Sequence, residues 1–232
     1  MMRLNRKQKI LRNLLVCLLL ILAAYAALGF PPCTVKEMCE RQRRNFLMPE
    51  MEPVYVLKEK HEFSGEWLSR RYTFIIARCE DTYLCFQYDW HGLQNTADSI
   101  RKPVIGGEVL CMARAGTMYV AGDFSDAASA TAVVRASNGT EYRDYELSGE
   151  KLSEEVFGFE YGYTRGFVED IPFEELRLGE IAEYWYRTPI GESSYSLNHA
   201  ELPVTVTLYD EGGKTVDTLS LTVSTYDLHS WY

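Results

Sequence analysis

The sequence VTVTLYDEGGKTVDTLSLTV, residues 204–223, contains two strand-like segments on either side of a polar turn. In the first segment Val204, Val206 and Leu208 alternate with threonine and tyrosine, so one face of a strand would be buried and the other wet. The turn ends in two glycines, which supply the positive φ angles that tight hairpins need. The stretch therefore predicts an antiparallel hairpin and indicates that the C-terminal half is mainly β.

A second hairpin is predicted around Ser137-Asn138-Gly139-Thr140, between strand-like residues 130–136 and 141–147. Many short strands separated by turn residues are typical of a β-sandwich, which we expect over residues 108–232. Additional strands are expected at residues 118–121, 157–163 and 182–186, and a short helix around residues 172–178.

Residues 33–107 have a different pattern, with one amphipathic helix before the strands. Thr34 and Glu37 form a capping box at the start of this helix, and Pro49 ends it. Such a short helix needs a surface to pack on, because isolated helices of this length are marginal in water. Strand-like residues 54–57, 67–77 and 83–88 follow, so we expect a small α+β domain with one helix on an antiparallel sheet.

The N-terminus carries the pattern of an export signal. Residues 1–13 contain five cations and no acid, and residues 14–30 form an uncharged apolar run. At about 1.5 Å per residue this run covers roughly 25 Å, just enough to cross a membrane core of ~30 Å with help from its flanks. We expect a transmembrane anchor or uncleaved signal at residues 14–30, with residues 1–13 cytoplasmic and the rest extracytoplasmic. The alternative is cleavage after Ala24-Tyr25-Ala26, which would make the protein secreted.

The charge after the apolar run is strongly negative. All 33 acidic residues but only 19 of the 24 Lys and Arg residues follow it, formally −14. Nucleic acid is therefore excluded as an expected partner, because phosphate binding needs clustered cations. The layout, one N-terminal span before a β-rich exported part, resembles that of many exported proteins of Gram-positive bacteria, and this resemblance implies nothing about mechanism.

Five cysteines lie after the run, so at least one would be unpaired in an oxidising exterior. Cys79 and Cys85 would lie on one hairpin, and we name them as a candidate disulfide. The cysteine intervals do not match zinc-binding pairs and the histidines are scattered, so no metal and no cofactor is predicted.

Short catalytic motifs in the chain have low specificity. Ser148-Gly-Glu-Lys151 matches the S-x-x-K of penicillin-recognising serine enzymes, but that motif requires a helix and Gly149 disfavours one. Glu169 and Glu174 could supply a carboxylate pair for glycoside hydrolysis, which needs two groups about 5 to 9 Å apart. No catalytic residue is predicted from these patterns.

Aromatic residues are abundant in the C-terminal half. Tyr184, Trp185 and Tyr186 would put rings on both faces of a strand, and Trp231 lies beside the C-terminus. We expect Trp185 in the core, and Tyr184, Tyr186 and Trp231 on a surface that contacts a protein or a carbohydrate. The hypothesis is a membrane-anchored extracytoplasmic binding or interaction module. The alternatives are a cell-surface hydrolase of carbohydrate or cell-wall polymer, and a structural ectodomain of a membrane complex.

Overall fold

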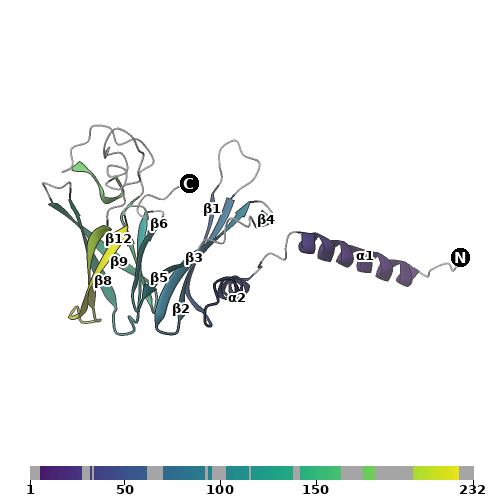
Figure 1. Cartoon of the computed structure of the whole chain (residues 1–232), viewed down its shortest axis with the longest axis horizontal. Helices are drawn as coiled ribbons and strands as arrows, with labels where there is room; N and C mark the ends of the chain where they lie inside the picture. Colours follow the sequence, from purple (N-terminus) through teal and green to yellow (C-terminus); the bar gives the residue numbers. More distant parts are fainter. Residues whose placement is uncertain are drawn as a thin grey trace.

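The computed structural model describes residues 6–27, 32, 34–61, 70–91, 94–95, 103–114, 116–137, 142–162, 175–180 and 201–224 of the chain. It contains an apolar N-terminal helix, a second short helix and two antiparallel sheets (Figure 1). The expectation of a mainly β chain behind an N-terminal apolar helix is confirmed. The segments expected at residues 182–186 and at 172–174 lie outside the described residues.

Helix α1 (Arg6–Ala27) points away from the β-rich body (Figure 1). It begins two turns before the apolar run, because arginine, lysine and leucine are all good helix formers. Its 22 residues correspond to a length of about 33 Å at 1.5 Å per residue.

Helix α2 (Val35–Phe46) starts as the sequence predicts. The hydroxyl of Thr34 accepts a hydrogen bond from the amide of Glu37 at 3.2 Å, and the Glu37 carboxylate accepts from the amide of Thr34 at 3.0 Å. Leu47 ends the helix in the left-handed region, with φ 52° and ψ 40°. A residue with a Cβ pays about 1–2 kcal/mol for that conformation, which glycine adopts more easily.

Sheet A has the strand order β1-β2-β3-β4, with β5 also paired to β3. Helix α2 covers one of its faces, where Met38 and Cys39 pack among buried residues of β2 and β3, and the Tyr88 hydroxyl donates to the Met38 carbonyl at 3.2 Å. A helix on an antiparallel sheet is therefore present, as expected. The strands are β1 (Glu52–His61), β2 (Arg70–Cys79), β3 (Thr82–His91), β4 (Gln94–Asn95) and β5 (Val104–Gly107).

Sheet B is one continuous sheet with the order β12-β11-β8-β9-β10-β7-β6. Both predicted hairpins are confirmed, since β8 pairs with β9 and β11 pairs with β12. The Asp210 carboxylate accepts from the amides of Gly212 and Lys214 at 2.9 and 2.8 Å, which fixes the second turn. The strands are β6 (Leu110–Arg114), β7 (Thr117–Ala121), β8 (Ser129–Ser137), β9 (Tyr142–Ser153), β10 (Val156–Glu160), β11 (Glu201–Tyr209) and β12 (Thr215–Ser224).

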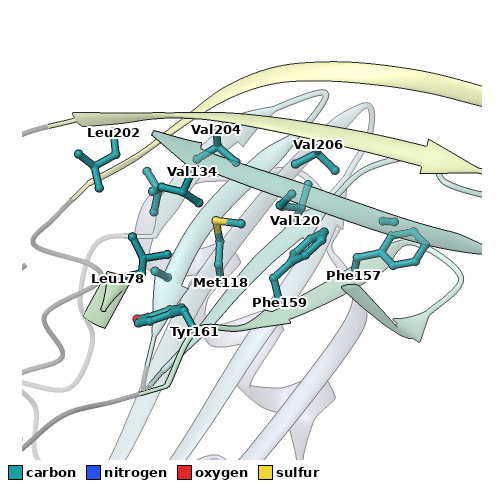
Figure 2. Packing of buried hydrophobic residues seen from close by; sticks show 14 of the residues in the cluster. Met118, Val120, Val134, Phe157, Phe159, Tyr161, Leu178, Leu202, Val204 and Val206 are labelled. Atoms are coloured by element: carbon teal, nitrogen blue, oxygen red, sulfur yellow. The ribbon is translucent and has the colours of Figure 1, made fainter. Parts of the chain in front are cut away.

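The main core lies on the inner face of sheet B. The sheet curls until β12 lies beside β6, and side chains from both ends of the sheet meet in one cluster. Figure 2 shows Val204 and Val206 of β11 on the opposite side of this cluster from Phe159. Gly149 of β9 permits the packing, because a Cβ there would lie 2.6 Å from the Phe159 ring.

A further cluster lies between the two sheets. Phe74 and Ile76 from sheet A pack with Met112 and Tyr119 from sheet B, and the Phe74 and Tyr119 rings are 5.3 Å apart. Successive residues of β7 point to opposite faces, so Tyr119 enters this cluster while Met118 enters the main core. Both faces of β6 and β7 are therefore buried, and the segments before and after residue 108 share a core.

Candidate functional site

Helix α1 exposes a continuous apolar surface. Ten of its large apolar side chains, between Ile10 and Leu22, are 47–68% exposed. Burying such a side chain fully stabilises by about 1.5–3 kcal/mol, so removing the remaining exposure of ten of them corresponds to on the order of 10 kcal/mol. By length and composition the helix can cross a membrane, and a signal sequence would share these properties.

The charges of α1 are confined to its N-terminal end. Arg6, Lys7, Lys9 and Arg12 occupy its first two turns, and all are exposed. Long cationic side chains can extend along an apolar surface and place their charges at its boundary with water. The helix is thus polar at one end and apolar over the rest of its length.

Helix α2 presents a charged outer surface to solvent. It carries four cations and two acids, and both acids are engaged within the helix. Glu37 accepts from the helix N-terminus, while Glu40 accepts from Arg43 and Arg44 at 2.8 Å. These two guanidinium groups lower the pKa of Glu40 to about 2. The outer surface of α2 is therefore net positive.

A polar cluster joins the two sheets at the edge of their shared core. Arg78 of β2 donates to Glu52 of β1 and to Glu155, which precedes β10, both at 2.9 Å. The Tyr83 hydroxyl donates to the second Glu155 oxygen at 2.6 Å. Burial, together with the negative Glu155, raises the pKa of Tyr83 to about 12, so the phenol remains a donor at neutral pH. This geometry fits a structural link between the two sheets, and we call the group of Glu52, Arg78, Tyr83 and Glu155 the clasp.

A buried cation lies deeper in the same interface. Arg114 of β6 is 7% exposed, and its guanidinium lies 5.2 Å from the centre of the Phe74 ring and 5.8 Å from that of Tyr72. It also donates from Nη1 to the side-chain oxygen of Gln87. Aromatic faces and an amide oxygen suit a guanidinium, so Arg114 connects the two sheets. No sequence pattern marked it.

The outer face of sheet B over β9, β8, β11 and β12 carries hydroxyl groups. Ser148, Thr131, Thr207 and Thr218 are register partners in turn, so they form a row across four strands. Adjacent strands are about 4.8 Å apart, which spaces the hydroxyls regularly. Thr205 and Ser220 are partners in the next row. We call these six residues the hydroxyl face; all are exposed except the half-buried Thr207.

The S-x-x-K motif has a structural role. Ser148 and Lys151 lie three positions apart within β9, so their side chains point to opposite faces of the sheet. Lys151 donates to the Ala127 carbonyl at 2.8 Å and pairs with Glu154 at 3.3 Å. The geometry gives no support to a serine nucleophile with a lysine base.

The candidate disulfide is not formed in this structure. Cys79 and Cys85 are buried and are not linked to each other, and they belong to clusters on opposite faces of sheet A. Burial raises the pKa of Cys79, and that of Cys39 to about 11, which keeps these thiols protonated. Cys79 packs under α2, whereas Cys85 faces sheet B, with its sulfur 2.9 Å from that of Met112.

The other residues proposed from the sequence lie outside the described part of the chain. These are the aromatic surface candidates Tyr184, Tyr186 and Trp231, the core candidate Trp185, and the carboxylates Glu169 and Glu174. Within the described ranges, no group of three or more His, Cys, Asp or Glu residues is arranged to hold a metal ion.

Comparison with known proteins finds no matching protein family, no similar curated protein and no similar solved structure.

Proposed function

We propose that the chain is a single-pass membrane protein whose β-rich body lies outside the cytoplasm and acts as a binding module. The exposed apolar surface of α1 carries this proposal, because water is a poor environment for ten large apolar side chains. A bilayer covers such a surface on all sides of the helix.

The charge pattern supports an orientation with the N-terminus in the cytoplasm. Five cations precede Leu14, and the first cation after Ala27 is Lys36, nine residues further on. Cytoplasmic flanks carry the excess of Lys and Arg. Arg41, Arg43 and Arg44 also lie on the C-terminal side of the apolar helix, so the numbers of cations on the two sides differ little. The orientation therefore depends on how close each cation lies to the membrane-spanning segment.

Protease added to intact cells or wall-free protoplasts tests this orientation. We expect cleavage of the body without lysis, and protection of an epitope placed before Arg3. As a charge control, replacing the five N-terminal cations with neutral residues should make the flank after α1 the more positive one. A fraction of the molecules should then insert in the opposite orientation, with the body protected from the added protease. A body that is protected in intact cells and cleaved after lysis would show the opposite orientation.

The hydroxyl face supports binding as the role of the body. Curling brings β11, β8 and β12 over β7 and β10, and we interpret sheet B as a sandwich-like unit formed from one sheet. Its outer rows of Ser and Thr offer donors and acceptors in a regular array, which suits the hydroxyl groups of a carbohydrate or the polar surface of a protein.

Photo-crosslinking tests this surface. A photoreactive amino acid at Thr131 or Thr205 should give a discrete adduct with a protein or a polysaccharide in intact cells. The same group at Glu211, in the turn between β11 and β12, is the control and should give none. Equal labelling at all three positions, or at none, would contradict the assignment of this face.

A further inference from the structure

We infer that the charged outer surface of α2, together with the adjacent Leu47, docks on the headgroups of the membrane that holds α1. The partner is a lipid surface carrying phosphate groups. The inference rests on the membrane insertion proposed above, and the experiment below separates the failure of one from the failure of the other.

The first argument is the length of the connection. Helix α1 ends at Ala27 and α2 begins at Val35, so seven residues join them. A chain of that length reaches at most about 25 Å. Figure 1 places α2 on the side of the body toward α1. Helix α2 is therefore held close to the membrane surface in every orientation of the β-rich body.

The second argument is charge. The exported part is formally −14, yet α2 carries four cations against two acids that are engaged within the helix. Lys36 and Arg44 are exposed, and the Arg44 side chain is 73% exposed. Glu50 is the acid that acts on Arg43 from beyond the helix, and it reduces the positive charge without cancelling it. Guanidinium and ammonium groups are favoured partners of lipid phosphates.

The third argument is Leu47. Its side chain is 92% exposed, and its backbone holds a left-handed conformation that favours glycine. The chain thus keeps a large apolar side chain where it is both strained and uncovered by the described protein. Strain of this kind points to a function for the side chain. An apolar group beside cations fits the boundary between headgroups and acyl chains.

The experiment uses the full chain reconstituted in vesicles. A fluorescent amino acid at the exposed Asn45 reports contact with nitroxide-labelled headgroups, and the same probe at Glu211 is the control. Figure 1 shows the β11–β12 hairpin, in yellow, on the side of the body away from α2. We expect strong quenching at position 45 in vesicles rich in phosphatidylglycerol, weaker quenching in phosphatidylcholine alone, and none at position 211.

Two variants identify the cause. Each cation near an anionic surface changes the docked population about fivefold, so Lys36→Glu with Arg44→Glu should lower the docked-to-free ratio by well over tenfold. Lys214→Glu is the matched reversal in the distant turn and should leave quenching unchanged. About 1 M salt, where the screening length falls to about 3 Å, should mimic the double variant.

Leu47→Gly separates docking from folding. Glycine relieves the left-handed strain, so the melting temperature should hold or rise while quenching at position 45 falls. A lower melting temperature with unchanged quenching would assign Leu47 to the fold and overturn the inference. A full chain that sediments with vesicles but shows equal quenching at positions 45 and 211 would overturn docking alone. A chain that does not sediment would overturn the proposed insertion.

Discussion

Replacing Phe74 by alanine tests whether the two sheets unfold as one unit. Phe74 is 2% exposed, and its ring packs on Tyr119 and on the Arg114 guanidinium of the other sheet. A buried phenylalanine truncated to alanine costs about 3–5 kcal/mol. For a protein of this size each kcal/mol lowers the melting temperature by about 2–4 °C, so we expect a drop of roughly 6–20 °C.

Ile75→Ala is the matched control. Ile75 is the next residue in β2 and is fully buried, but its side chain faces α2 and not sheet B. Its truncation should cost about 2–5 kcal/mol as well, which makes melting temperature alone uninformative. The distinction lies in where the structure loosens.

Amide hydrogen exchange on the detergent-solubilised chain supplies that distinction. Phe74→Ala should speed exchange in β6 and β7 of sheet B, because the shared cluster loses its central ring. Ile75→Ala should speed exchange in α2 and leave β6 and β7 close to the parent. If Phe74→Ala left exchange in sheet B unchanged, the sheets would be independent and the shared core would carry little energy.

The remaining predictions concern the clasp, the helix cap and the thiols. Between pH 10 and 12 the unfolded chain releases the Tyr83 proton while the native state retains it, so the free energy of unfolding should fall as pH rises through this window. Chemical denaturation titrations at several pH values measure this dependence, and Tyr83→Phe should make it weaker. Thr34→Ala should cost about 1 kcal/mol in the same titrations, because the amide of Glu37 loses its partner. In non-reducing mass spectrometry Cys79 and Cys85 should not be linked to each other, whereas Thr82→Cys should link to Cys79, its register partner.

The features predicted from the sequence depend on residues that are close together in the chain. The capping box of α2 spans four residues, and the hairpins depend on alternation on either side of a turn. These signals are local, so tertiary contacts did not have to be known. The apolar run before Pro31 is likewise recognised as a possible membrane-spanning segment from its length and composition alone.

The features that the sequence did not reveal join distant residues. Arg78 and Glu155 are 77 positions apart, and Arg114 meets Gln87 across two sheets. The burial of both faces of β6 and β7 follows from how sheet A packs on sheet B, and a pattern read along one strand does not contain that information. The clasp and the shared core could therefore not be predicted from local patterns.

Cys79 and Cys85 show that the pairing register of two strands determines whether a disulfide can form, which the spacing of the cysteines in the sequence does not. Cys79 lies opposite Thr82 across a two-residue turn, which puts Cys85 opposite Ile76. Side chains alternate along each strand, so a thiol opposite Thr82 and a thiol opposite Ile76 point to different faces. A one-residue shift in the register of β3 would turn Cys85 to the face of Cys79. The C-x5-C spacing is the same in both cases, and the two-residue turn that contains Glu80, with its positive φ of 56°, occurs with the register in which the two thiols are separated by the sheet.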